Sequence, residues 1–234
     1  ARAAQVADSV RALLAATRLA GAPVLTVSAV SGAGIAELRA LLEREAAVQA
    51  QRQSADQHFR YAIDRVFSVA GSGTVVTGTV FNGVVNAGDR VTISPAGLEA
   101  RVRGIQIQGK PAQRAAAGQR CALNLSGSGL AALGRGDWAL APALHRPTQR
   151  IDARITALAA EQQALRHWMP VHLHLATADV TARLAIRRGA SVAPGASALV
   201  QIVLDKPVVA LHGDRFILRD QSASRTLGGG VVLD

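Results

Sequence analysis

The apolar positions at the start of the chain have the spacing of one helix face. They are Val6, Val10, Leu13 and Leu14. This spacing predicts a helix over residues 3–20, ended by the glycine and proline of residues 21–23. A short β-rich run at residues 24–30 predicts a buried strand, and a second apolar stripe at residues 35–42 predicts another helix. Helix, strand and helix in this order form an α/β fragment, so we expect residues 1–54 to be a remnant of a larger α/β domain that ends in a polar linker.

From Phe59 onward the pattern changes to short stretches with a period of two, separated by glycine turns. The clearest predicted strands are Thr74–Val80, Val91–Ser94, Arg101–Gln108 and Arg120–Leu125. In the last of these, Cys121, Leu123 and Leu125 share one face, which directs Arg120 away from the core.

A second set of alternating stretches follows the polar segment at residues 145–150, which we interpret as a boundary. These stretches are residues 151–155, 171–175 and 200–204, with turns at Pro194–Gly195 and His212–Asp214. The predicted fold class is therefore mainly β, with two small antiparallel β-barrels, residues 57–145 and 146–234, preceded by the α/β stub.

The composition fits a globular protein of the cytoplasm. The chain is 49% hydrophobic, but it has neither an apolar run that could span a bilayer nor a secretory signal at its start. Its single cysteine, Cys121, lies in an alternating stretch and is predicted to be a buried thiol in a reducing compartment. We expect no membrane association.

The charge points to a polyanionic partner. The net charge is +10, and all but two of the 26 basic residues are arginines, whose planar donors suit phosphates. GC-rich coding alone could also produce this excess. The chain has 2 Trp, 1 Tyr and 4 Phe, which is few for a surface that stacks successive single-stranded bases, so contact with a folded RNA backbone fits better.

Several familiar motifs fail on context. Gly71–Gly73 lacks the third glycine and the helix of a dinucleotide loop, and Gly109–Lys110 is followed by proline instead of the serine or threonine of a P-loop. His172 and His174 share a strand face but have no partners at zinc-like spacing, so an exposed strand face is favoured and no metal site is predicted. No catalytic set stands out.

Longer stretches resemble the translational GTPases. The segment IDRVFSVAGSGTVVTGTVFNGVVNAGD, residues 63–89, is similar to the opening of their second domain, and AGQRCALNLSG (117–127) and RGDW (135–138) resemble later strands of that barrel. HLATADVTARL (174–184), APG (193–195) and residues 207–232 resemble the third domain. The resemblance covers most of the chain and implies that the two barrels are domains II and III of such a protein.

The stub also fits this resemblance. VSAVSGAGI, residues 27–35, resembles the last guanine-contacting loop of the GTPase domain, in which the backbone of Ser28, Ala29 and Val30 would meet the base. The P-loop, the switch segments and the NKxD motif do not occur in the sequence, so we expect this polypeptide alone to be no enzyme and to hold no cofactor. The resemblance implies that an intact parent would be a GTPase that uses GTP and magnesium.

Within this group the chain most resembles the bacterial selenocysteine-specific elongation factors. The general factor carries two adjacent acids where this chain has Asp64–Arg65, and a neutral amide where it has Arg120. A selenol is more acidic than a thiol and arrives largely as an anion, which arginines favour. By resemblance, Phe67 and Thr77 would shape the aminoacyl pocket and Asp64 would orient Arg65, while Gln106 and Gln108 would lie near the terminal adenosine of the tRNA. The alternative is that both arginines are merely solvated charges.

The function implied is that of a carrier. The first barrel would grip the aminoacyl end of selenocysteyl-tRNA and the second would contact the acceptor and T stems, so that the parent delivers this tRNA to the ribosome at a recoded UGA codon. An mRNA hairpin would be read only by a C-terminal region that this sequence does not contain. Alternatives are the barrels of a general elongation or initiation factor, or the regulatory GTPase subunit of sulfate adenylyltransferase, which would dock a protein partner.

Overall fold

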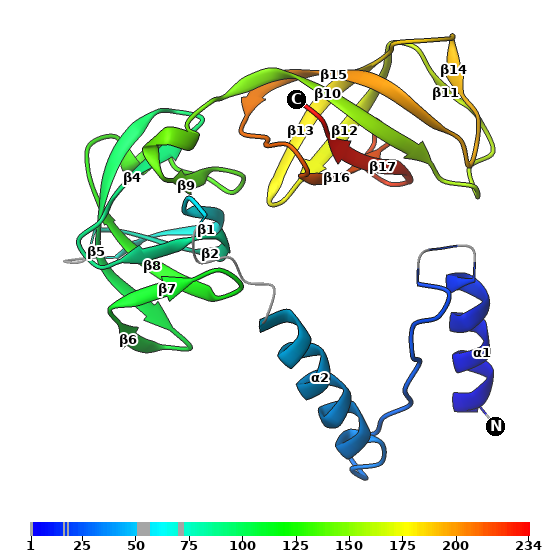
Figure 1. The fold of residues 1–234 in the computed structure, drawn as a ribbon, viewed down its shortest axis with the longest axis horizontal. Coiled ribbons are helices and arrows are strands. Elements are labelled where there is room, and N and C mark those ends of the chain that lie inside the picture. The colour runs from blue at the N-terminus through cyan, green and yellow to red at the C-terminus, as the bar shows by residue number, and fades with distance from the viewer. Residues whose placement is uncertain (1, 16, 18, 51–56, 70–72) are drawn as a thin grey trace. The chain divides into compact units, whose positions relative to one another are not determined.

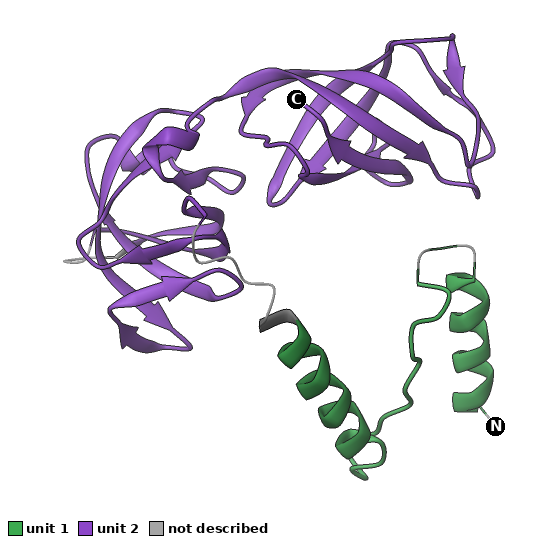
Figure 2. Cartoon of the chain, viewed as in Figure 1, with its two compact units in different colours: residues 1–53 green, residues 54–234 purple. Residues whose placement is uncertain are grey.

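The computed structural model describes residues 2–15, 17, 19–50, 57–69 and 73–234. The contacts divide the chain into two compact units, Ala1–Gln53 and Ser54–Asp234 (Figure 2). None of the described helices is long and apolar enough to cross a membrane.

The N-terminal unit contains two helices, α1 (Arg2–Leu14) and α2 (Ile35–Ala50). The first is shorter than predicted, because the Thr17 hydroxyl donates to the Leu14 carbonyl at 2.8 Å and accepts from the Leu19 amide at 3.1 Å. Such local side-chain bonds replace those of a continuing helix. The polar linker prediction falls partly on residues 51–56, which lie outside the described residues.

The strand predicted at residues 24–30 is wrong. These residues have no strand assignment, and no described strand pairs with them. Instead, the Ser28 amide donates to the Ala33 carbonyl and the Gly32 amide to the Ser28 carbonyl, both at 2.9 Å, which closes a loop. An apolar β-rich run forms a strand only where a neighbouring strand accepts its backbone hydrogen bonds.

The first barrel consists of six antiparallel strands (Figure 1). In the order in which they pair, they are β4 (Arg90–Ser94), β9 (Trp138–Leu140), β1 (Arg60–Val69), β2 (Gly73–Asn82), β8 (Arg120–Ser126) and β5 (Leu98–Ile107), and pairing of β5 with β4 closes the ring. The short strand β6 (Lys110–Ala112) pairs with β5, and β3 (Val84–Asn86) pairs with β7 (Arg114–Ala116). Single 3₁₀ turns lie at Leu130–Ala132 and Pro142–Leu144. As predicted, Cys121, Leu123 and Leu125 face the core, and Arg120 is exposed.

The second barrel is also closed by six antiparallel strands. In pairing order they are β10 (Thr148–Ala157), β15 (Ser197–Val208), β13 (Ala178–Ile186), β12 (Met169–Leu175), β16 (Arg215–Arg219) and β17 (Thr226–Val232), with β11 (Leu165–Arg166) and β14 (Ser191–Val192) forming a small separate ladder. All three predicted alternating stretches place their apolar residues in its core. The prediction of a mainly β fold with two antiparallel barrels is confirmed.

The two barrels touch through a buried polar contact. Arg60, at the start of β1, donates from Nη1 and Nη2 to the two carboxylate oxygens of Asp214 at 2.9 and 2.7 Å, and its guanidinium carbon lies 4.6 Å from the centre of the Trp138 ring. Val209 packs against Trp138 in the same cluster. Both barrels fall in one compact unit, so the predicted boundary between residues 145 and 146 stays a prediction.

Candidate functional site

A β-bulge in β1 places two charged residues on the same side of the first barrel. Ile63 pairs with Gly78 and Arg65 with Thr77, which leaves Asp64 as the extra residue. Since Ile63 and Val66 both pack against the core, the extra residue directs Asp64 and Arg65 to the outer face. Strict alternation would have pointed Arg65 inward.

Gly78 allows β1 and β2 to approach each other beside the bulge. A Cβ atom at this position would lie 2.0 Å from the Ala62 carbonyl oxygen and 3.0 Å from the Tyr61 ring. Only glycine therefore fits without a shift of one strand.

The barrel register brings the predicted site residues into neighbouring rows. Arg65, Thr77, Ala122 and Gln106 are successive cross-strand partners on β1, β2, β8 and β5. Phe67 lies in the next row, and Arg120 pairs with Thr79. We call Asp64, Arg65, Phe67, Thr77 and Arg120 the Asp64 face. It is an open surface on which Phe67 is 44% exposed.

Gln108 does not belong to these rows. The strand that was predicted to reach it ends at Ile107, and Gln108 has φ 52° and Gly109 has φ 75°. Two successive residues with positive φ form the tight turn of a two-residue hairpin, here between β5 and β6. Gln108 therefore lies at the tip of the hairpin and Gln106 on the strand.

Asp64 is the centre of the polar contacts on the Asp64 face. The Thr77 hydroxyl donates to Asp64 Oδ1 at 2.7 Å, and Arg120 Nη2 donates to Oδ1 and Oδ2 at 3.0 and 2.9 Å. Arg120 Nη2 also lies 3.4 Å from the Thr77 hydroxyl oxygen. Asp64 thus orients Arg120, whereas the resemblance implied that Asp64 would orient Arg65. The contact uses one of the three guanidinium nitrogens, and the formal charge of Asp64, Arg65 and Arg120 together is +1.

The strands behind the Asp64 face are joined by a buried tyrosine. The Tyr61 hydroxyl donates toward the Cys121 carbonyl at 2.9 Å and the Val76 carbonyl at 3.2 Å, and burial holds its pKa far above the usual range. Burial also raises the pKa of the Cys121 thiol to about 11. Each of these carbonyls belongs to the residue next to a site residue, Thr77 or Arg120, so the tyrosine fixes the backbone that positions both.

The RGDW segment, residues 135–138, forms backbone hydrogen bonds with Ile63 next to the bulge. The Ile63 amide donates to the Asp137 carbonyl at 2.9 Å, and the Gly136 amide donates to the Ile63 carbonyl at 3.2 Å. Burial raises the pKa of Asp137, partly offset by the Gly134 amide, which donates to its carboxylate. The sequence placed RGDW only among the later strands, because nothing in it shows which strand the segment supports.

In the N-terminal unit, Ser28, Ala29 and Val30 form part of the closed loop described above. The Ser28 hydroxyl accepts from the Ser31 amide at 3.2 Å, and Ala29 and Val30 are exposed. Gly34 has φ 72° and passes so close to the Thr26 carbonyl that a Cβ would lie 2.3 Å from its oxygen. The loop therefore presents its backbone at an exposed turn.

On the second barrel, His172 and His174 lie on the outer face of β12. His172 Nδ1 lies 2.8 Å from Asp179 Oδ1, and the two imidazole rings are 6.4 Å apart. Among the described residues, no group of three histidine, cysteine, aspartate or glutamate side chains is arranged to hold a metal ion.

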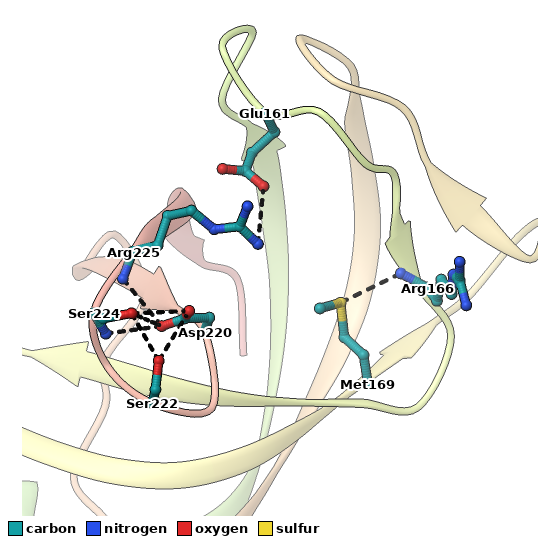
Figure 3. Close-up of polar contacts among 7 residues, drawn as sticks. All are labelled: Glu161, Arg166, Met169, Asp220, Ser222, Ser224 and Arg225. Atoms are coloured by element: carbon teal, nitrogen blue, oxygen red, sulfur yellow. Dashed lines mark hydrogen bonds and ion pairs between the residues drawn. The ribbon is translucent and has the colours of Figure 1, made fainter.

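A second polar cluster closes the loop between β16 and β17 (Figure 3). The Asp220 carboxylate accepts from the amides of Ser224 and Arg225 at 2.8 and 3.0 Å and from the hydroxyls of Ser222 and Ser224. The Arg225 amide first, then these other donors, lower the pKa of Asp220. Arg225 Nη2 also lies 3.7 Å from the largely buried carboxylate of Glu161.

Comparison with known families gives the class of this arrangement. Residues 73–140 match the family model described as elongation factor Tu domain 2, and residues 152–234 match the one described as selenocysteine-specific elongation factor, beta-barrel domain. The two barrels are therefore those of a translation elongation factor.

Individual relatives narrow this class. Selenocysteine-specific elongation factors of Desulfomicrobium baculatum and Haemophilus influenzae are 35% and 37% identical over 229 and 217 residues, which cover 98% and 92% of this chain and 36% and 34% of the relatives. The chain belongs to the selenocysteine-specific elongation factor family and spans about a third of the length of these curated relatives. The fold of the translation elongation factor SelB from Methanococcus maripaludis, in its apo form, matches with a TM-score of 0.80 and 23% identity, covering 98% of this chain and 54% of that one.

Proposed function

We propose that this chain is the part of a selenocysteine-specific elongation factor that carries selenocysteyl-tRNA, and that the intact parent delivers this tRNA to the ribosome at a recoded UGA codon in a GTP-dependent step. The observation that supports the proposal most strongly is that Arg65 and Arg120 lie on one outer face of the barrel, where the Asp64 carboxylate binds Arg120. Family membership supports it independently.

Charge would give the Asp64 face its selectivity. A selenol is largely ionised at neutral pH, whereas the serine hydroxyl is neutral and a cysteine thiol, with a pKa of about 8.5, is mostly protonated. A charge-assisted hydrogen bond contributes about 1.5 to 3 kcal/mol, roughly twice a neutral one. Asp64 offsets one of the two guanidinium charges, so the remaining positive charge favours an anion over a neutral side chain.

The other predicted residues complete the contact with the aminoacyl end. Phe67 and Thr77 would bound the side chain of the amino acid, since Thr77 pairs directly with Arg65 and Phe67 lies in the next row. Gln106 lies two strands beyond Thr77 in the same row, and Gln108 lies at the adjoining hairpin tip. Amide side chains at these positions could hydrogen-bond the terminal adenosine.

The rest of the tRNA would bind the second barrel. Arginine–phosphate contacts with the acceptor and T stems would make this part of the affinity strongly dependent on salt. We further propose that GTP and magnesium are held by parts of the parent outside this sequence, with the backbone of Ser28, Ala29 and Val30 contacting the guanine. The ribosome would then be a partner of the parent, and an mRNA hairpin would be bound by a region outside this chain.

The test compares three aminoacyl groups on the same tRNA body. Selenocysteyl-tRNA should bind the intact parent at least tenfold more tightly than seryl-tRNA at pH 7, which corresponds to about 1.4 kcal/mol. Affinity for cysteinyl-tRNA should rise as the pH approaches 8.5 and its thiol ionises, while affinity for seryl-tRNA stays constant. Equal affinities for all three at every pH would rule out a charge-selective site.

A further inference from the structure

An exposed tryptophan stands at a strained corner of the second barrel. Trp168 lies in the turn between β11 and β12, is 49% exposed and has φ 65°, a left-handed conformation that bulky side chains rarely adopt. Its amide donates to the Leu184 carbonyl at 2.7 Å, and its carbonyl accepts from Arg183 Nη1 at 3.3 Å. Strain that the surrounding contacts maintain at a surface residue is typical of functional positions.

The ring of Trp168 is held in place by its neighbour. His167 stacks on it with centroids 6.2 Å apart and planes 28° apart. His167 is itself fixed, because its Nδ1 accepts from the Ile186 amide at 3.2 Å and its own amide donates to the Ala190 carbonyl at 2.9 Å. A large aromatic surface is therefore presented to solvent in a defined orientation.

Four arginines belong to the turn that holds this ring or to the segment that contacts it. Arg166 precedes the turn, and its backbone amide donates to the Met169 sulfur (Figure 3). Arg183 donates to the Trp168 carbonyl. Arg187 and Arg188 follow Ile186 in the sequence. All four are exposed, and within the part of the chain that the structure describes none lies within salt-bridge distance of a carboxylate. Asp179 is the one acidic residue between positions 162 and 204. We call His167, Trp168 and these four arginines the Trp168 surface.

We propose that the Trp168 surface binds an unpaired nucleotide of RNA, with the base stacked on Trp168 and the arginines contacting the phosphates on either side. A paired stem offers phosphates but no free base face, so the RNA group that suits an exposed indole is an unstacked base. A protein partner would need acidic side chains opposite four unpaired guanidinium groups, whereas RNA supplies that charge at every nucleotide. One ring serves one base, which agrees with the small number of aromatics in the chain. The proposal does not depend on the Asp64 face.

The test measures binding to the 234-residue chain through the fluorescence anisotropy of two end-labelled RNA probes, an oligouridylate of about 24 nucleotides and a blunt RNA duplex of about 12 base pairs with nearly equal charge. The intrinsic tryptophan fluorescence of the wild-type chain reports contact with Trp168. The other tryptophan, Trp138, is 2% exposed and serves as an internal reference. Oligouridylate should quench Trp168 and bind more tightly than the duplex. Trp168→Gly removes the ring and relieves the strained φ, so the variant should remain folded with an unchanged or higher Tm.

Trp168→Gly should weaken oligouridylate binding by about tenfold, the loss expected for one base stack, and leave duplex binding unchanged. Trp168→Phe should keep most of the affinity, while Arg187→Ala with Arg188→Ala should weaken both probes and flatten their salt dependence. Unchanged oligouridylate affinity in Trp168→Gly, or a Trp168 emission shift caused by another protein domain but not by RNA, would overturn the proposal. Competition by an uncharged tRNA transcript and by ribosomes then distinguishes the two RNAs that could supply the nucleotide.

Discussion

At the scale of single residues, Asp64 fixes the position of the Arg120 guanidinium on the outer face of the first barrel. It accepts from Thr77 and from Arg120, so the guanidinium is held before any ligand arrives. The sequence alone singled out Arg65 and Arg120 as candidates, because they differ in charge from the residues of the general factor, and their role in a site stays a prediction. The partner of Asp64 was not predictable, since choosing between Arg65 and Arg120 requires the register across three strands and the position of the bulge.

Cys121 gives a residue-scale test of this register. The thiol is 3% exposed and has a pKa of about 11, so both burial and a low thiolate fraction should slow its reaction with a thiol reagent at pH 8. The native chain should react at least a hundredfold more slowly than the chain in denaturant, as absorbance of the released reporter would show. Rapid reaction of the native chain would mean that β8 is shifted by one residue, which would exchange Cys121 with Arg120.

At the scale of elements, the strands were predictable wherever one face is buried and the other is exposed to solvent, because apolar and polar residues then alternate, as in residues 120–125 and 151–155. The prediction failed at residues 24–30, because an apolar run has the same appearance with or without a partner strand. The bulge at Asp64 was also invisible, since one extra residue breaks the alternation locally and leaves no distinct pattern. The one sequence feature that accompanies the bulge is Gly78, the partner of Ile63 on the neighbouring strand.

Gly78 therefore gives an element-scale prediction. Gly78→Ala should cost about 3 kcal/mol or more of unfolding free energy, because the new methyl group would overlap the Ala62 carbonyl and push β1 from β2. Gly104→Ala is the matched control: a Cβ there meets nothing within 4 Å, so its effect should stay below about 1 kcal/mol. Urea unfolding measures both, and equal costs would show that the two strands do not depend on close approach at Gly78.

At the scale of the whole molecule, the pair Arg60–Asp214 joins the two barrels of residues 54–234. Arg60 is 4% exposed and its Nε has no hydrogen-bond partner among the described residues, so the guanidinium depends on Asp214 for compensation. The pair could not be foreseen, because the two residues are 154 positions apart and nothing in either segment indicates the other.

Asp214→Ala should lower the unfolding free energy by about 3 to 5 kcal/mol, since it leaves a buried charge unpaired. The double variant Arg60→Met with Asp214→Leu, which removes both charges, should recover at least half of that loss. Urea unfolding followed by circular dichroism provides the measurement. A single variant as stable as the wild type would show that the barrels do not rely on this pair.

Selectivity for an anionic aminoacyl side chain is the central claim, and one substitution tests it most directly. In the intact parent, Arg120→Asn should lower the affinity for selenocysteyl-tRNA about ten- to hundredfold, equivalent to roughly 1.5 to 3 kcal/mol, and should change the affinity for seryl-tRNA much less. Arg114→Asn, the same change at an exposed position on β7, controls for the general loss of charge. The expected result is a fall in the ratio of the two affinities in the Arg120 variant alone. Equal losses for both tRNAs would contradict the account and place Arg120 against the tRNA backbone instead.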